Sequence, residues 1–437
     1  MLGVFSTMPI VGISLAGHFI TLFTVFFIMF FGLTVFFTIS KKSYCKKFSE
    51  IEIFFMIFMV WSLVGYVIGY NILPSVWHKY TTQYALKVIE YILLFLLIHL
   101  YNNKDLVEKY VNGFIIGCIV NCIWCVCQGV FYLTLHRFLN DLLFPNSGGE
   151  VWTQYGGIRA GGLNYDPANM GVLLPIVVYY GLKEKNILIL LITGVSLVFS
   201  QSTTAMVGCI FVIVSALIIN SKKNNKTILE KKKRKLSKLL IIILAILVLV
   251  FAFKSGAIEK ILNGIRAYVE GYLNRINDNY VSASDKGPRE IYYKYFIKQF
   301  YQRNILFWFC GSGIGTSMEA YAEYKIFGIV GVNVFGEIEA TYLAYLFDCG
   351  IIGLAFFLIF VVRSLKAMYI KLINTGERIA IIMMGFLLSM SISNLFYHYI
   401  IAANQMLMFM FLTTYLKNDF KYRNILNTIQ NKKIYKV

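Results

Sequence analysis

Charged residues are scarce in this sequence. Asp, Glu, Lys and Arg make up 14% of its 437 residues, there are only six prolines, and 58% of the residues are hydrophobic. Because soluble domains carry about 25% charged residues, this composition excludes an ordinary soluble enzyme. A basic domain is also missing, since the lysines and arginines lie mostly in short stretches between apolar runs. The net charge of +19 therefore does not indicate a nucleic-acid partner.

Signals for processing and for metal binding are equally weak. Residues 1–40 lack a charged start and a small-residue cleavage site, so no signal peptide is predicted and this segment is expected to be retained. Cys118, Cys122 and Cys125 recur at helical spacing in an apolar run beside Cys127, which indicates packing against neighbouring helices. Cys122 and Cys125 form a CxxC, but the further ligands of a zinc site are absent. We expect no metal and no cofactor.

Apolar runs recur along nearly the whole chain. Runs of roughly 20 residues are long enough to cross a hydrocarbon core about 30 Å thick. We therefore predict an all-α, polytopic integral membrane protein in which residues 1–437 form a single membrane domain. About twelve spans are predicted, over residues 3–18, 19–39, 51–73, 81–101, 109–134, 167–182, 186–200, 203–220, 239–255, 338–362, 378–397 and 399–417. The first two are the weakest, since residues 1–39 could instead form one long tilted helix.

The basic residues predict an orientation. Lysines follow the second, sixth and eighth spans, basic residues follow the twelfth, and a loop with Arg363, Lys366 and Lys371 is expected after the tenth. Under the positive-inside rule these loops and both termini are cytoplasmic. Residues 135–166 and a large loop over 256–337, between the ninth and tenth spans, then face the periplasm.

The large loop has helical patterns of its own. Residues 256–276 carry apolar side chains at helical spacing, which predicts an amphipathic helix at the outer membrane–water boundary. A second helix is predicted from Pro288 through residue 303, with an aromatic face that includes Tyr292. The glycines of GSGIG, residues 311–315, are expected to break the helix.

One polar stretch, GGIRAGGLNYDPANMG over residues 156–171, leads from a predicted outward loop into the sixth span. Its Arg159 lies between paired glycines, and the planar guanidinium fork suits a diphosphate, although an arginine near a membrane also commonly reaches lipid head groups. Asn164, Asp166 and Asn169 follow near the membrane boundary. Asp166 has a simpler interpretation, which is to cap a helix that begins at Pro167.

Three further acidic or basic residues are candidates for chemistry. Arg289 begins the second loop helix, where it either contacts an anion or pairs with Glu290. Glu339 precedes the tenth span and could serve as a base in a wet cavity. Asp348 lies deeper in that span, where it either faces the cavity or bonds a hydroxyl or amide of another helix.

Other polar residues have simpler interpretations. Lys87 and Glu90 are expected to pair within the fourth span. Residues 200–204, a polar outward turn, and His398 with Asn404, in another, could line the same cavity or be ordinary loop residues.

The order of these motifs resembles the O-antigen ligase and polymerase superfamily, which includes the Wzy-type membrane glycosyltransferases. The resemblance spans roughly residues 156–362. It rests on GGIRAGGLNYDPANMG, LVFSQSTTAMVG, GPREIYYKYF with GSGIG, and EATYLAYLFDCGIIGL. It implies a fold like that of the GT-C glycosyltransferases, in the bacterial inner membrane.

The resemblance also implies a reaction. Members of the family transfer a glycan from undecaprenyl diphosphate to an acceptor at the periplasmic face, without a nucleotide sugar or a metal. Arg159 and Arg289 would then hold the donor diphosphate, and Glu339 would orient or deprotonate the acceptor hydroxyl, at a position where the ligases look to have a histidine. Further substrate contacts are expected from Asn164, Asp166, Asn169, Ser202, Thr203, Tyr292, Gly313 and Tyr342.

The favoured function is therefore an O-antigen polymerase whose donor and acceptor are both glycans linked to undecaprenyl diphosphate. Its other expected partners are membrane lipids and a chain-length regulator protein. The alternatives are an O-antigen ligase, whose acceptor is lipid A-core, and a flippase for the lipid-linked oligosaccharide. A transporter should show related halves or helices broken at the membrane midplane, and the sequence shows neither.

Overall fold

The computed structural model describes residues 1–15, 18–40, 47–72, 78–101, 103–135, 137–144, 152–154, 157–164, 169–200, 202–223, 304–317, 341–395 and 405–417. The predicted ninth span and both predicted loop helices lie outside these residues. Apart from the first, each predicted span that falls on described residues coincides with a helix. The helices are α1 (Leu2–Phe5), α2 (Leu22–Ser40), α3 (Glu50–Ile72), α4 (His78–Tyr101), α5 (Lys104–Leu135), α6 (Leu139–Leu143), α7 (Met170–Glu184), α8 (Ile187–Ser200), α9 (Thr203–Lys223), α13 (Ile305–Cys310), α15 (Thr341–Thr375), α16 (Arg378–Ser393) and a last helix over 405–417.

Five described helices, α2, α3, α4, α5 and α15, are long and apolar enough to cross a membrane, and α8, α9 and α16 are apolar but shorter. Large apolar side chains lie exposed on their outer faces, among them Ile28, Leu93 and Leu191. A protein surface in water rarely exposes so much apolar area, whereas lipid tails solvate it well. The protein is therefore a multi-pass membrane protein, as the sequence predicts.

The predicted first span is wrong. Residues 2–5 form only the four-residue α1, and β1 (Gly12–Leu15) and β2 (His18–Thr21) form an antiparallel hairpin before α2 begins. A four-residue helix is about 6 Å long, far short of the hydrocarbon thickness. A second hairpin pairs β3 (Trp152–Gln154) with β4 (Gly157–Arg159). The fold is thus helical with two small hairpins.

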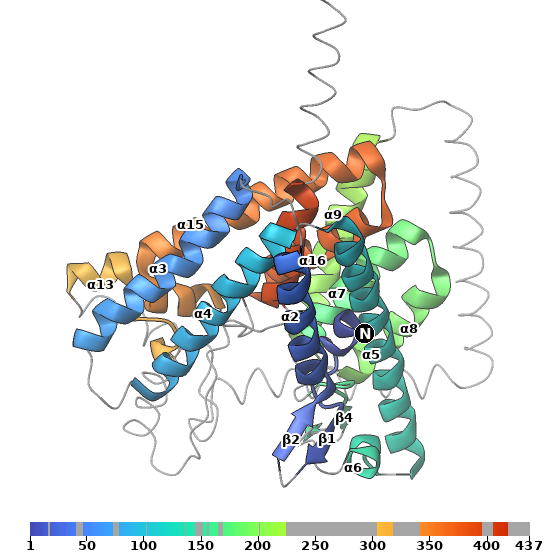
Figure 1. Cartoon of the computed structure of the whole chain (residues 1–437). Coiled ribbons are helices and arrows are strands. Elements are labelled where there is room, and N and C mark those ends of the chain that lie inside the picture. Colours follow the sequence, from blue (N-terminus) through green and yellow to red (C-terminus); the bar gives the residue numbers. More distant parts are fainter. Residues whose placement is uncertain are drawn as a thin grey trace, which may run out of the picture.

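The two ends of the helix bundle differ in composition. Figure 1 shows the strands β1, β2 and β4 together with α6 at one end, which we call the Arg159 end. At the other end Glu52, His99 and Lys417 contact one another, and we call it the Lys417 end. Helix α5 runs between them, from Lys104, which closely follows α4, to the segment that carries α6.

Aromatic side chains join the helices in the core. The ring centroids of Phe55 and Phe360 are 4.9 Å apart, those of Phe360 and Phe409 are 5.2 Å apart, and those of Phe386 and Phe409 are 5.3 Å apart. These contacts link α3, α15, the 405–417 helix and α16 in one buried cluster. Tilted and edge-on ring pairs of this kind add about 0.5–1.5 kcal/mol each beyond area burial.

Helix α15 departs from the prediction in two ways. The sequence predicts a loop that contains Arg363, Lys366 and Lys371, but all three lie within α15, which extends to Thr375. Lys371 is buried, and its ammonium lies 3.1 Å from the centroid of the Tyr415 ring. Arg363 and Lys371 each lie over an aromatic ring, Phe54 and Tyr415 respectively, and their aliphatic stems can pack against apolar surface. The helix can therefore continue past the predicted span with these cations on it.

The second departure is a break at Gly350, whose φ of 66° and ψ of −174° are not helical. No broken helix was visible in the sequence, so the structure corrects the sequence analysis at this point. The break leaves backbone carbonyls without their helical hydrogen bonds, and these carbonyls accept hydrogen bonds from other elements instead. Trp61 Nε1 donates to the carbonyl of Cys349 at 3.1 Å, and the N–H of Gly313 donates to the carbonyl of Asp348 at 2.8 Å. Non-helical backbone in a membrane protein persists where protein groups satisfy it in this way.

Candidate functional site

The segment that carries Arg159 is fixed to the helices around it. In β4, Arg159 pairs with Trp152 of β3. The N–H of the next residue, Ala160, donates to the carbonyl of Phe199 near the end of α8 at 2.9 Å, and its carbonyl accepts the Sγ of Cys125 at 3.6 Å. Arg159 itself is half-buried. Its backbone therefore has a defined position where α5 and α8 meet at the Arg159 end.

Two carboxamides of α5 hold the glycine-rich turn that follows. Gln128 Oε1 accepts the N–H of Gly162 at 2.8 Å, and Asn121 Oδ1 accepts the N–H of Leu163 at 2.9 Å. Gly162 has a φ of 66°, a region that a residue with a Cβ rarely adopts. Asn164 Nδ2 also donates to Asn121 Oδ1, at 2.9 Å. Asn121 and Gln128 were not among the predicted site residues, although two carboxamides on a membrane helix are themselves a polar signal.

Helix α7 begins next to this turn, with Asn169 as its N-cap residue. The predicted helix start at Pro167 and its predicted cap, Asp166, both lie outside the described residues. Pro175 has no N–H to bond the carbonyl of Gly171, and the hydroxyl of Ser393 in α16 donates to that carbonyl at 3.0 Å instead. Ser389 of α16 likewise donates to Val172 at 2.7 Å, so α16 anchors the first turn of α7.

A hollow opens between α5, α7, α16 and the 405–417 helix. It is lined by the apolar Phe114, Val172, Leu173 and Phe386 and by the carboxamides of Asn164, Asn169 and Gln405. Two of these carboxamides belong to the predicted site, and the structure brings them together. Gln405, which is 5% exposed, was missed because it lies far along the chain in an otherwise apolar helix.

Asp348 has a separate structural role. It is fully buried, and its carboxylate accepts the N–H of Gly315 at 2.8 Å, the N–H of Ser317 at 2.7 Å and the hydroxyl of Thr316 at 3.1 Å. These bonds tie the turn after α13 to α15. Of the two interpretations open from the sequence, the structure supports a partner for amide and hydroxyl donors. The predicted break at GSGIG is confirmed, because α13 ends at Cys310 just before it.

Gly313 lies inside this turn, with a φ of 103°. A Cβ there would come within 2.9 Å of the Cα of Tyr66 in α3. Gly65 and Gly69 of α3 make the matching space, since a Cβ on Gly69 would overlap the carbonyl of Ser312. Gly313 is thus a packing position between α3 and α15, and does not line the Asn164 hollow.

The remaining predicted residues have varied placements. Ser202 accepts the N–H of Ala205 at 3.2 Å through its hydroxyl, so it caps α9. The hydroxyl of Tyr342 donates to the carbonyl of Ser391 in α16 at 3.1 Å, close to the end of that helix. Thr203 begins α9. The residues that lie outside the described part of the chain are Asp166, Arg289, Tyr292, Glu339, His398 and Asn404.

Two other expectations can be checked. Cys118, Cys122 and Cys125 are fully buried and free, and Cys125 contacts the carbonyls of Ala160 and Ser196, which confirms a packing role. The predicted ion pair between Lys87 and Glu90 is wrong, because the ion pairs of the described residues do not include it. The Lys87 ammonium instead lies 5.0 Å from the centroid of the Tyr84 ring.

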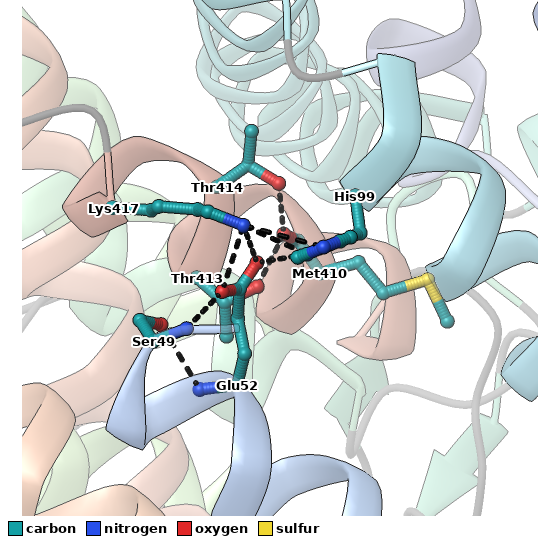
Figure 2. Close-up of polar contacts among 7 residues, drawn as sticks. All are labelled: Ser49, Glu52, His99, Met410, Thr413, Thr414 and Lys417. Atoms are coloured by element: carbon teal, nitrogen blue, oxygen red, sulfur yellow. Dashed lines mark hydrogen bonds and ion pairs between the residues drawn. The ribbon is translucent and has the colours of Figure 1, made fainter. Parts of the chain in front are cut away.

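A buried polar cluster lies at the Lys417 end (Figure 2). Glu52 of α3 is fully buried, its Oε1 is 2.8 Å from Nδ1 of His99, and its Oε2 is 3.2 Å from Nζ of Lys417. The N–H of Ser49 donates to the same carboxylate at 2.6 Å. The cluster joins α3, α4 and the 405–417 helix at the end of the bundle opposite the Arg159 segment. We interpret it as structural.

The described residues can hold and orient a polar ligand at the Arg159 end. They combine a half-buried arginine on a fixed turn with a nearby hollow of carboxamides and aromatic rings. Within the described part of the chain, no group of three or more His, Cys, Asp or Glu side chains is arranged to hold a metal ion. A guanidinium on a fixed turn can form charge-assisted hydrogen bonds to an anion.

These features define a multi-pass membrane protein with a polar site at one end of its helix bundle. Comparison with protein families adds that residues 188–358 match the family described as O-Antigen ligase. This segment runs from α8 through the break in α15. The match confirms the resemblance to the O-antigen ligase and polymerase superfamily. No curated protein matches the chain.

Proposed function

We propose that the protein is an O-antigen polymerase of the bacterial inner membrane. In this proposal residues 1–437 act as one membrane domain, the lysine-rich Lys417 end faces the cytoplasm, and the Arg159 end faces the periplasm. The observation that carries the proposal is the matched family segment together with the arginine turn fixed beside its first helix, α8.

The reaction joins two lipid-linked glycans. A hydroxyl of the acceptor sugar attacks the anomeric carbon of the donor glycan, the bond from that carbon to the diphosphate oxygen breaks, and undecaprenyl diphosphate leaves. Arg159, with Arg289, stabilises the charge on the leaving diphosphate through charge-assisted hydrogen bonds. Glu339 orients the hydroxyl or takes its proton, which contributes about 10²- to 10⁴-fold to the rate for a true general base.

The fixed backbone around Arg159 supports this role. A leaving group gains most from a cation that does not have to move when charge develops, and the bonds from α5 and α8 hold the turn in place. Asn164 and Asn169 follow this turn closely in sequence and line the hollow, which supports their proposed role as substrate-binding residues. For Asp166, Ser202, Thr203, Tyr292, Gly313 and Tyr342 substrate contact remains a prediction, and the capping and packing roles of Ser202 and Gly313 favour structural functions.

Two alternatives have specific support. The family description names a ligase, which would transfer the glycan to lipid A-core. Secondary transporters also use helices broken within the membrane, and α15 is broken at Gly350, so a flippase for the lipid-linked oligosaccharide is a second alternative.

One experiment separates these functions. Lipopolysaccharide is compared by gel electrophoresis in a host with the complete matching glycan gene cluster, with and without this gene. A polymerase predicts that deletion leaves core with a single repeat unit, because the ligase still acts. Bare core contradicts the proposal. It indicates a ligase if lipid-linked polymer accumulates in the periplasm, and a flippase if single lipid-linked units accumulate in the cytoplasm.

Substitution of the arginine tests the mechanism in the same host. We expect Arg159→Ala to abolish the polymer ladder while membrane levels of the protein stay normal, because no other group replaces its bidentate bonds to diphosphate. Arg137→Ala is the matched control, since Arg137 is an exposed arginine shortly before α6 at the same end. A normal ladder from Arg159→Ala would remove this residue from the mechanism.

A further inference from the structure

Residues 1–11, which we call the N-terminal segment, lie directly against α5. Gly3 is buried in α1, and a Cβ on it would come within 2.1 Å of the carbonyl oxygen of Tyr110 in α5. From the other side, a Cβ on Gly117 of α5 would come within 2.5 Å of the carbonyl oxygen of Val4. Small residues at such contacts let two backbones approach closely in a membrane protein. The two glycines therefore bring the backbone of the segment onto that of α5.

Asn121 connects the N-terminal segment to the arginine turn, residues 159–164. Its side chain is fully buried, its Nδ2 donates to the carbonyl of Thr7 at 2.8 Å, and its Oδ1 accepts the N–H of Leu163 at 2.9 Å. The N–H of Ile10 also donates to the carbonyl of Leu163, at 3.4 Å. The segment thus holds the turn directly and through one carboxamide.

Apolar packing adds to these hydrogen bonds. Met8 and Ile10 of the N-terminal segment are buried together with Leu163 of the turn, in a small cluster that is separate from the main core. Trp124 of α5 and Phe144, which follows α6, pack against this cluster. The largest apolar side chain of the turn therefore depends on the N-terminal segment for its burial.

Arg159 lies in the same short turn, so the position of the segment affects it. The bond of Ala160 to α8 fixes one side of the turn, and the N-terminal segment fixes the other through Leu163. A cation that stabilises a leaving group contributes most when it is held in place before the charge develops. Misplacement of a catalytic group by about 1 Å can lower a rate roughly a hundredfold.

We propose that the N-terminal segment, acting through Asn121, positions Arg159 in the active site. Asn121 is then a positioning residue, and the proposal rests on the function proposed above. The segment and Asn121 lie outside residues 188–358, which match the family. The active site would thus include a part of the chain that the family match does not cover.

Amide hydrogen exchange of the purified, detergent-solubilised protein tests the positioning without any substrate. Gly117→Ala displaces the N-terminal segment and keeps every hydrogen-bonding group, whereas Asn121→Leu removes the connecting carboxamide. In both variants the amides of Gly162 and Leu163 should exchange about tenfold faster than in wild type, because the turn opens more easily. Gly113→Ala is the matched control, since its Cβ would face the same segment at an ordinary 3.4 Å.

The second readout is the rate of chain growth from lipid-linked repeat units in membranes of the host with the matching glycan gene cluster. The rate is divided by the amount of folded protein, measured by size-exclusion chromatography. We expect kcat to fall about tenfold or more in Gly117→Ala and Asn121→Leu, and to stay normal in Gly113→Ala. A variant that is only less stable has fewer folded molecules, each with the wild-type kcat, and that result would overturn the positioning role.

The outcomes separate this proposal from the polymerase assignment. Wild-type exchange at the turn in Gly117→Ala and Asn121→Leu would overturn the proposal, whatever polymer the host makes. If both variants exchange faster at the turn while deletion of the gene leaves polymer intact, the polymerase assignment fails and the hold of the N-terminal segment on the turn is supported. If one variant does not fold, the other decides by the same two readouts.

Discussion

Lys417→Met should destabilise the folded protein strongly, because it removes a cation from a buried carboxylate. The Glu52 carboxylate is fully buried, and Nζ of Lys417 lies 3.2 Å from it. Breaking a buried ion pair by removing one partner costs roughly 3–5 kcal/mol, since the other charge stays buried. His99 and the N–H of Ser49 still contact Glu52, so we expect a loss near the lower end, about 3 kcal/mol.

The assay is the free energy of unfolding from denaturant titration in detergent micelles. Lys104→Met is the control, because Lys104 pairs with Glu108 on the surface, with side chains 52% and 39% exposed, and such pairs contribute about 0.3–0.5 kcal/mol. The double variant Glu52→Gln with Lys417→Met removes both charges, so its loss should fall short of the sum of the single losses by at least about 1 kcal/mol. Strict additivity, or equal losses in Lys417→Met and Lys104→Met, would refute the reasoning.

Two further predictions concern packing between helices. Gly69→Ala should destabilise by about 1–3 kcal/mol in the same denaturant titration, because its Cβ would overlap the carbonyl of Ser312. Gly32→Ala, with nothing within 4 Å of its Cβ, should be neutral or stabilising. Ser393→Ala should lower stability by about 1 kcal/mol through loss of its bond to α7, and Ser391→Ala, whose hydroxyl bonds its own helix, should change little. Equal free energies of unfolding within either pair would contradict this packing.

The helices were predictable because each depends on a local run of apolar residues. Apolar length alone located α3, α4 and α5 to within a few residues. It failed at residues 3–18, because a hydropathy window does not distinguish a hairpin with a short helix from a spanning helix. It also ended α15 too early, since Arg363, Lys366 and Lys371 lie close together in sequence and suggest a loop, whereas the buried Lys371 has an aromatic partner distant in sequence.

The site was predictable only in part. The arginine between paired glycines marked this segment as a candidate site, and Asn164 and Asn169 were candidates because they lie near the predicted helix start. Gln405 depends on the contact of the last helix with α5, α7 and α16, which no local pattern carries. The role of Asp348 likewise became clear only from the turn after α13, because a buried acid in an apolar helix is equally compatible with a cavity and with a structural bond.

The contact between the turn after α13 and α15 has a topological consequence. Gly315, Thr316 and Ser317 are all bonded to Asp348, so the chain contacts this part of α15 before the helix begins at Thr341. One carboxylate thus joins two segments, 304–317 and 341–375, that are separate in sequence. A change at this single side chain therefore acts on both segments at once.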